Sequence, residues 1–411
     1  MPRTVIPWII FVLTIAMDMY GYSAIKHLVV HSSENTKRIA NAIYWGMTAY
    51  VVLFFVLSIS LNLRENSTPV TRFMLGIVLG IFVSKLFLSL MLLSQDFFRF
   101  FNWGYQRFFI NPVNMDNSRR QFLEKLSLGF ASIPLFAFVY GMVNTAYDYK
   151  IHRARVPIPN LPKGLQGLKI VQISDIHSGS LSDMEAIKRG IQMINDLTAD
   201  LFVFTGDLVN NRSKEFPKFI ELFREIKAPL GQYSILGNHD YGDYVDWDSD
   251  ESKAENLKTL KKYHLDSNWD ILCNEHRIIN HNGERFALIG VENWSSKGFV
   301  KHGDLKKAYR GTEDVPTKIL LSHDPSHWDA EVTQDYNDIS LTLSGHTHGM
   351  QFGIENKWIR FSPVQWVYRQ WAGLYTKEAQ HIYVNRGFGF IGYPGRVGIR
   401  PEITLLTLEK A

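Results

Sequence analysis

The chain divides into an apolar first third and a remainder in which short apolar runs alternate with polar residues. Four apolar blocks occupy the first 145 residues, at roughly 5–25, 39–61, 73–93 and 126–143. Each is close to the ~20 residues that an α-helix needs to cross about 30 Å of hydrocarbon. The pattern predicts an anchor of about four transmembrane helices. A re-entrant or interfacial course stays open for the last block, which is short and contains Pro134.

Charged residues within and beside these blocks add two expectations. After the third block, FFRFFNWGYQRFF interleaves aromatic residues with Arg99 and Arg107, which favours a position in the headgroup region. Asp18 and Lys85 stand at nearly the same depth in the first and third blocks, which run in the same direction. Because lone charges at this depth are costly, we expect an intramembrane ion pair; the alternative is a snorkelling Lys85 beside a solvated Asp18.

From about residue 144 the sequence becomes polar, and strand-like runs begin to alternate with helix-like ones. Residues 146–164 contain VPIPNLPKG, which predicts an extended linker between the anchor, residues 1–145, and a soluble domain, residues 165–411. In that domain SDMEAIKRGIQMINDLTAD and EFPKFIELFREIK carry apolar residues at helical spacing. This alternation predicts an α/β fold that binds ligands beyond the carboxyl ends of its strands.

Polar residues follow five of the strand-like runs, in LKIVQISDIHSG, ADLFVFTGDLVN, GQYSILGNHD, TKILLSHDP and ISLTLSGHTHG. Carboxylate, imidazole and amide groups without thiolate suit divalent Mn, Fe or Zn. In extended chain, side chains at i and i+2 point the same way, so Asp175 and His177 can reach one ion. His346 and His348 can chelate one ion or straddle two that lie ~3.5 to 4 Å apart, and Gly345 and Gly349 permit the tight turn there. Each ending alone is ordinary loop sequence, but the five together predict a metal site.

Composition bears on the partners of the chain more than on its fold. The 44 basic and 40 acidic residues give a net charge of +4, without the strongly basic stripe of a nucleic-acid surface, so nucleic acid is not an expected partner. Cys273 is the only cysteine, which excludes an internal disulfide framework and a cysteine metal cluster.

The segments SDIHSG, GDLVN, GNHD, LSHDP and GHTHG, in this order, resemble the motif set of the calcineurin-like metallophosphoesterase superfamily. The resemblance covers roughly residue 165 to the C-terminus. Its opening and closing segments are similar to a bacterial branch of membrane-tethered and exported phosphoesterases, which includes enzymes acting on UDP-2,3-diacylglucosamine. It implies a four-layered α/β/β/α sandwich with two metal ions between the strand ends, whereas the helical anchor rests on hydropathy alone.

The resemblance also implies roles for individual residues. One ion would be held by Asp175, His177 and His348, Asp207 would bridge, and the other would be held by Asn238, His323 and His346. His239 would donate a hydrogen bond or proton near the leaving group, with Asp240 placed to orient it. The usual GHTHGGQ appears here as GHTHGMQ, with Met350 in place of a glycine at the rim of the site, a departure that leaves the implied metal ligands unchanged.

Three arginines of the glycine-rich closing segment, Arg386, Arg396 and Arg400, are candidates for gripping a phosphate or diphosphate; the alternative is that they are solvated surface residues.

The function expected from these features is hydrolysis of a phosphodiester or pyrophosphate bond by a metal-bridging hydroxide. The anchor suggests a lipid-linked or membrane-proximal substrate. One alternative is a cytosol-facing UDP-2,3-diacylglucosamine hydrolase of lipid A synthesis, and another is a membrane sensor that binds metal without catalysis.

The side of the membrane is decided only weakly by the sequence. Basic residues near the ends of the blocks number eight on one side of the membrane and seven on the other, so the positive-inside rule does not indicate which side is cytoplasmic. NSRRQFLEK, directly before the fourth block, resembles a twin-arginine export signal; a cytoplasmic basic flank is the alternative. We therefore expect a multi-pass protein of the bacterial inner membrane, possible use of the twin-arginine machinery, and an extracytoplasmic catalytic domain, with the cytoplasmic face as the alternative.

Overall fold

A computed structural model of the chain describes residues 5–61, 63, 68–109 and 117–411. The chain forms two compact units, Met1–Met142 and Val143–Ala411. The first unit contains the helices α1 (Val5–Leu28), α2 (Glu34–Ser60), α3 (Pro69–Phe109) and α4 (Asn117–Tyr140), so all four predicted apolar blocks are helical. Three stretches of the described residues are long and apolar enough to cross a membrane: Glu34–Ser60, Pro69–Phe108 and Gln121–Thr145.

The third and fourth blocks differ from the prediction in their lengths. The aromatic segment continues α3, which extends over 41 residues, and its position in the headgroup region stays a prediction. Helix α4 runs unbroken through Pro134 and ends in the π-helical turn Gly141–Thr145. Next to the proline, the amide of Leu135 donates to Ser84 Oγ of α3 at 2.9 Å. A side chain of a neighbouring helix thus satisfies the backbone at the proline, as transmembrane helices require.

The expected intramembrane ion pair is confirmed. Lys85 Nζ of α3 lies 2.5 Å from Asp18 Oδ1 of α1, and both side chains are buried. Helix α2 contributes to the same cluster: Thr48 Oγ1 accepts a hydrogen bond from Lys85 Nζ at 3.0 Å, and the Tyr44 hydroxyl donates to the carbonyl of Asp18 at 2.8 Å. The two charges therefore connect three helices inside the anchor instead of reaching toward water.

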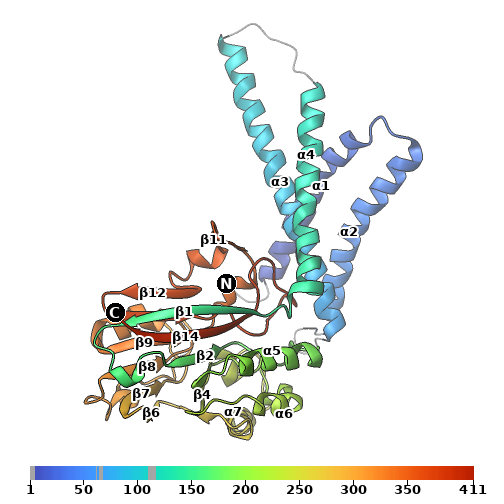
Figure 1. The fold of residues 1–411 in the computed structure, drawn as a ribbon. Coiled ribbons are helices and arrows are strands. Elements are labelled where there is room, and N and C mark those ends of the chain that lie inside the picture. Colours follow the sequence, from blue (N-terminus) through green and yellow to red (C-terminus); the bar gives the residue numbers. More distant parts are fainter. Residues whose placement is uncertain (1–4, 62, 64–67, 110–116) are drawn as a thin grey trace. The chain divides into compact units, whose positions relative to one another are not determined.

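The second unit is built on two six-stranded sheets (Figure 1). The order of the first sheet is β1 (Lys150–Ile158), β14 (Glu402–Lys410), β2 (Lys169–Ile173), β3 (Leu201–Thr205), β4 (Gln232–Ile235) and β5 (Asp270–Ile271). The order of the second is β12 (Gly373–Lys377), β13 (Gln380–Val384), β9 (Ile339–Ser344), β8 (Thr317–Leu321), β7 (Glu284–Gly290) and β6 (Glu275–His281). Strands β2 to β5 are parallel, as are β7, β8, β9 and β13.

Alternating side chains of the strands divide the core into the predicted four layers. In β3, Leu201 and Val203 face the second sheet, whereas Phe202 and Phe204 pack against helices α5 (Met184–Asp196), α6 (Ile220–Arg224) and α7 (Asp250–Asp266). The outer face of the second sheet packs on α8 (Leu305–Tyr309) and on a helical turn at Trp328–Val332. The α/β/β/α sandwich is confirmed, and its helices form because their apolar residues recur at helical spacing.

Residues 146–164 are extended but do not form a free linker. Lys150–Ile158 is strand β1, which pairs in parallel with β14 along its whole length (Figure 1). The prolines predict an extended linker, and the pairing of this segment into the sheet was not predicted. Pro157 is tolerated because β1 is the edge strand, where a missing N–H leaves no neighbour without a donor. The sheet therefore begins within a few residues of the last apolar helix.

Candidate metal centre

The predicted ligands all lie in loops that leave the carboxyl ends of strands. Asp175 and His177 follow β2, Asp207 follows β3, and Asn238 follows β4 of the first sheet; His323 follows β8, and His346 and His348 follow β9 of the second. Parallel strands place these ends at one edge of each sheet, and the two sheets are stacked. The loops therefore meet across the sandwich, as the sequence pattern predicted.

One group of ligands contains Asp175, His177 and His348, whose ligand atoms lie within 4.8 Å of one another. The Nε2 atoms of the two histidines are 3.0 Å apart, and His348 Nε2 is 3.1 Å from Asp175 Oδ1. All three side chains are buried. A carboxylate and two imidazoles that converge in this way form a set of donors for one divalent ion of the Mn, Fe or Zn kind.

The second group contains Asp207, His323 and His346, again with ligand atoms within 4.8 Å of one another. His323 Nε2 lies 3.2 Å from Asp207 Oδ2, 3.2 Å from Asn238 Oδ1 and 3.3 Å from His346 Nδ1. The same Asp207 Oδ2 is 3.6 Å from His177 Nε2 of the first group. Asp207 therefore stands between the two groups, where a bridging ligand would stand, and the residues fit two divalent ions.

The backbone around the site is left-handed, which the sequence argument did not foresee. Five of the ligands have positive φ: Asp175 (53°), His177 (46°), Asp207 (62°), His346 (71°) and His348 (50°). The backbone at these residues is therefore not the extended chain that we assumed. The expected groupings hold nonetheless: Asp175 and His177 join one group, and His346 and His348 join different groups, which is one of the two arrangements left open for them. Such unfavourable backbone is held by the surrounding fold and gathers at functional sites.

Two glycines are required because other groups approach them closely. A Cβ at Gly345 would lie 1.8 Å from Ser174 Oγ and 2.3 Å from Asp175 Oδ2, and one at Gly237 would lie 2.3 Å from Asp207 Oδ1. We expected Gly345 to serve a tight turn, but its φ is not positive; that role fits Gly349, whose φ is 53°. Gly345 and Gly237 instead leave room for the carboxylates of Asp175 and Asp207 in the candidate site.

Hydrogen bonds select which nitrogen of two histidines faces the site. His323 Nδ1 donates to the Thr205 carbonyl at 2.8 Å, which leaves Nε2 for the site. His346 turns the other way: its Nε2 is 2.8 Å from the Tyr368 hydroxyl, which donates to Asp324 Oδ2 at 3.1 Å, so that Nδ1 faces the site. Outer partners of this kind orient ligands and raise metal affinity.

Two tyrosines in these contacts were missed by sequence reasoning. Tyr368 lies outside every motif, in the segment after strand β11 (Arg360–Phe361). Tyr244 accepts a hydrogen bond from Asn238 Nδ2 at 2.8 Å, which points Asn238 Oδ1 at the site. Nothing in the chain around Tyr368 marks it, because its role depends on a contact with a loop about twenty residues earlier. For Tyr244, proximity to GNHD was the one available signal.

His239 is oriented by a backbone carbonyl and not by Asp240. Its Nδ1 donates to the carbonyl of Asn210 at 2.7 Å, and its half-buried ring lies edge-on to the ring of His177 at 5.0 Å. Asp240 is fully buried and accepts hydrogen bonds from four backbone amides, those of Asp207, Leu208, Val209 and Gly237. The expected role of Asp240 is therefore corrected: it holds together the two loops that carry Asp207 and Asn238.

Electrostatics keep the carboxylates ionised and two of the imidazoles neutral. Burial acts to raise the pKa of Asp175 and of Asp207, but neighbouring histidines outweigh it and hold both pKa values below the ordinary range. Burial lowers the pKa of His177 and of His346, so both present lone pairs. For His323 the Asp207 carboxylate overcomes burial and raises the pKa to about 10. Metal binding needs ionised carboxylates and neutral imidazoles, so His323 is the exception and would have to release a proton when a metal ion binds.

The three arginines proposed for phosphate are engaged elsewhere. Arg386 is buried and paired with Glu402 and Glu355, each at 2.5 Å. Arg396 is fully buried and donates to the carbonyls of Arg386, Gly387 and Gly389. Arg400 is half exposed and pairs with Asp148 at 2.5 Å. Neither the expected phosphate grip nor the alternative of solvated surface residues describes the first two, which hold the closing segment in place.

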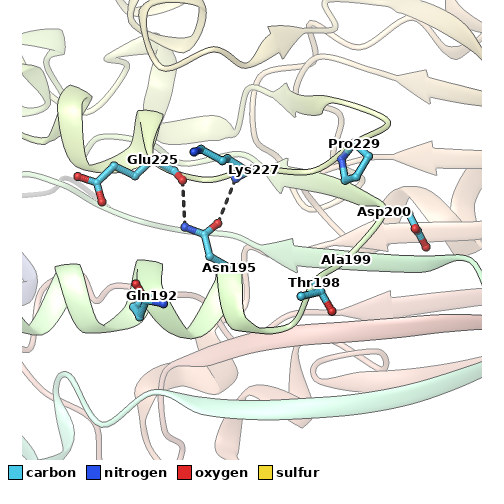
Figure 2. Close-up of a pocket in the computed structure, with 8 residues that line it drawn as sticks. All are labelled: Gln192, Asn195, Thr198, Ala199, Asp200, Glu225, Lys227 and Pro229. Atoms are coloured by element: carbon cyan, nitrogen blue, oxygen red, sulfur yellow. Dashed lines mark hydrogen bonds between the residues drawn. The ribbon is translucent and has the colours of Figure 1, made fainter.

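A pocket of about 660 Å³ lies at another place in the same unit (Figure 2). It is lined by the end of α5 and by residues that precede β3 and β4, so it lies at the amino ends of those strands. Asn195 spans it, donating to the Glu225 carbonyl at 2.9 Å and accepting from the Lys227 amide at 3.1 Å (Figure 2). None of the predicted ligands lines this pocket, and it stands at the sheet edge opposite the metal ligands.

Comparison with known proteins agrees with this geometry. Residues 168–350 match the family model for calcineurin-like phosphoesterases, and residues 2–146 match the model described as a probable calcineurin-like phosphoesterase transmembrane domain. The metallophosphoesterase YkuE of Bacillus subtilis is 32% identical over 299 residues, which cover 71% of this chain and 98% of that protein. The chain belongs to the calcineurin-like phosphoesterases. It is a membrane protein of that family, and its domains follow the order of the two matches.

Two other relatives of this phosphoesterase also match it across the catalytic unit. A transmembrane protein with a metallophosphoesterase domain from Danio rerio is 32% identical over 283 residues, covering 66% of this chain and 60% of that protein. The UDP-2,3-diacylglucosamine pyrophosphatase LpxG of Chlamydia trachomatis is 30% identical over 281 residues, covering 56% of this chain and 81% of that protein. The chain thus spans about three-fifths of the Danio rerio relative and most of the two bacterial ones.

Proposed function

We propose that this chain is a membrane-anchored phosphoesterase that hydrolyses a phosphodiester or pyrophosphate bond of a lipid-linked or membrane-proximal substrate. The observation that carries the proposal is the pair of buried ligand groups with Asp207 between them and His239 beside them. Divalent ions held there would lower the pKa of a water molecule and neutralise charge on the phosphoryl oxygens. Membership of the calcineurin-like phosphoesterases supports the reaction class.

The chain's own residues then have distinct tasks. Asp207 reaches both groups and would set their spacing, whereas Asn238, His323 and His346 complete the second group. Because Nδ1 of His239 is committed to the Asn210 carbonyl, its Nε2 is the atom that would exchange a proton with the leaving oxygen. In this assignment His239 acts on the substrate and leaves the ion-binding residues untouched.

A matched pair of variants tests the proposal in the purified full chain. We expect Asp207→Asn to lose both bound metal and turnover, since it removes a charge shared by the two groups. His239→Asn should keep its metal content but lose about 10²- to 10⁴-fold in turnover, the usual contribution of a general acid or base. The loss should be greatest with alkyl leaving groups, which need the proton most. Full activity of His239→Asn on alkyl esters would refute the assignment.

A second candidate is a UDP-2,3-diacylglucosamine hydrolase that works at the cytosolic face. Its support is the similarity to LpxG over 281 residues, and UDP-sugars are made in the cytosol. The side of the membrane separates the two candidates. Our proposal places the catalytic unit outside the cytoplasm, on the strength of SRRQFLEK, in which the side chains of Arg119 and Arg120 lie outside the described part of the structure.

Reporters fused to the C-terminus, one active only in the cytoplasm and one only outside, would decide the topology. Each should be measured with and without Arg119→Lys and Arg120→Lys. External activity that depends on the arginines supports export of the folded unit. A cytoplasmic C-terminus would make UDP-2,3-diacylglucosamine the first substrate to test.

A further inference from the structure

Exposed large apolar side chains of the catalytic unit are concentrated after the last metal ligand. The hairpin of β10 (Ile354–Glu355) and β11 (Arg360–Phe361), with the helical turn Pro363–Trp366, exposes residues that we call the tryptophan surface: Ile354, Trp358, Ile359, Trp366 and Val367. Trp358 is 84% exposed and Trp366 is 75% exposed. Elsewhere in this unit exposed apolar residues such as Leu265 occur singly, which is normal, whereas a contiguous patch marks an interaction site.

Contacts within the segment connect the two ends of the tryptophan surface. Ile354 stands opposite Phe361 in the hairpin, and the Phe361 ring meets the Trp366 ring edge-on at 5.9 Å. At the hairpin tip, Asn356 Oδ1 accepts hydrogen bonds from the amides of Trp358 and Ile359 at 2.8 and 2.9 Å. This closed turn holds the two apolar side chains in solvent, where a loop would ordinarily carry polar ones.

The tryptophan surface is tied to the metal centre. Glu355 pairs with the buried Arg386, and Ser362 Oγ donates to the carbonyl of Gly349, next to the ligand His348. Tyr368, which follows Val367 directly, contacts His346. The surface is thus preorganised beside the catalytic loops, so that binding there would cost little conformational entropy.

Its chemistry fits one occupant, the interfacial region of a lipid bilayer. Tryptophan favours that region because its ring is apolar while its N–H remains hydrogen-bonded to water or headgroups. Basic residues beside the tryptophan favour anionic headgroups. Between residues 350 and 369 the charged residues are Lys357, Arg360 and Arg369 against Glu355 alone, so basic residues outnumber acidic ones. Lys357 Nζ lies 5.2 Å from the centre of the Trp358 ring, so charge and aromatic ring are adjacent.

The covalent connection brings a bilayer within range of this unit. The last apolar stretch ends at Thr145 and β1 begins at Lys150, a separation that spans at most about 18 Å of extended chain. We propose that the tryptophan surface inserts into the bilayer interface and holds the metal centre at the lipid headgroups. This deepens the proposed function, on which it rests for its substrate class: a phosphoester whose lipid part stays in the membrane.

A fluorescent label tests the docking without any assay of catalysis. In the full chain carrying Cys273→Ser, Trp358→Cys and, as matched control, Leu265→Cys are labelled with an environment-sensitive dye. The chain is reconstituted in vesicles of phosphatidylcholine and phosphatidylglycerol. We expect the label at 358 to shift to shorter wavelength and to be quenched by spin-labelled lipid, whereas the label at 265 behaves as in water. Equal behaviour of the two labels would overturn docking.

Two further outcomes would also overturn it in favour of another occupant. Protection of the label at 358 in detergent, with cross-linking between chains, would assign the tryptophan surface to a second copy. Protection only after a phosphorylated lipid is added would make it a subsite for the acyl chains of the substrate.

Turnover provides the second arm of the experiment. The double variant Trp358→Ser, Trp366→Ser should lose about tenfold to 100-fold on a phosphoester embedded in vesicles, because each of the two partly buried tryptophans is worth up to roughly tenfold. It should keep its rate on water-soluble bis(p-nitrophenyl) phosphate, as should Leu265→Ser on both substrates. An equal loss on both substrates would contradict docking. If the unaltered chain hydrolyses neither, the proposed function fails, while the label still decides the docking.

Discussion

Asp240→Asn separates the role that the structure gives this carboxylate from the one suggested by its position beside His239. Oδ1 accepts from Leu208 and Val209, and Oδ2 accepts from Asp207 at 3.0 Å and from Gly237 at 2.8 Å. An asparagine can keep one oxygen in place but must turn its NH₂ group toward the other two donors. The substitution therefore removes two charge-assisted hydrogen bonds and leaves buried amides facing a donor.

The structure sets the magnitude of this effect. Burial and then the neighbouring Asp207 carboxylate raise the pKa of Asp240 to about 7, so the carboxylate is fully charged only above that pH, where the comparison is made. There, hydrogen bonds to a charged group contribute about 1.5–3 kcal/mol each, so two of them amount to roughly 3–6 kcal/mol. At about 2–4 °C per kcal/mol for a domain of this size, the midpoint of thermal unfolding should fall by roughly 6–24 °C. Metal affinity should fall as well, because the amide of Asp207 is one of those released.

The measurement is thermal unfolding and metal content of the full chain in detergent. Asp243→Asn is a matched control in the same loop: its carboxylate pairs with Lys253 at 2.5 Å, and such half-exposed pairs contribute less than about 1 kcal/mol. An Asp240→Asn protein with an unchanged midpoint and full metal content, impaired only in the pH dependence of turnover, would refute the reasoning. Asp240 would then act through His239 after all.

The remaining predictions concern an outer partner, a close approach and the anchor. Tyr368→Phe should lower metal affinity about tenfold, since it removes the hydroxyl that contacts His346 Nε2; equilibrium titration with Mn²⁺ measures it. Gly345→Ala should abolish metal binding, because its Cβ would meet an Asp175 oxygen at 2.3 Å; metal content measures it. Asp18→Asn or Lys85→Met alone should destabilise the anchor by about 3–5 kcal/mol, whereas the double variant should be near neutral; unfolding in detergent measures both. The first prediction would be contradicted if Tyr368→Phe bound Mn²⁺ as tightly as the control Tyr309→Phe. The second would be contradicted if Gly345→Ala still bound metal, and the third if the double variant were as unstable as the single variants.

The sequence by itself determined the parts of this protein that depend on local pattern. Hydropathy set the helices of the anchor, because an apolar run of sufficient length must satisfy its backbone within one helix. The five strand endings set which residues meet, since parallel strands deliver their carboxyl ends to one edge whatever the loops between them do. The same pattern identified the intramembrane pair of Asp18 and Lys85, as two costly charges at one depth have few other partners.

Only the tertiary structure decided features that depend on what a residue packs against. The sequence of β1 predicted a linker, but in the structure β1 pairs with β14, which comes from the far end of the chain. The sequence predicted that Arg386 binds phosphate, but in the structure Arg386 pairs with Glu402 and Glu355. The sequence predicted that Asp240 orients His239, but Asp240 accepts hydrogen bonds from four backbone amides. These roles come from contacts between segments that folding brings together, and no local sequence pattern specifies which donor a buried carboxylate or guanidinium will meet.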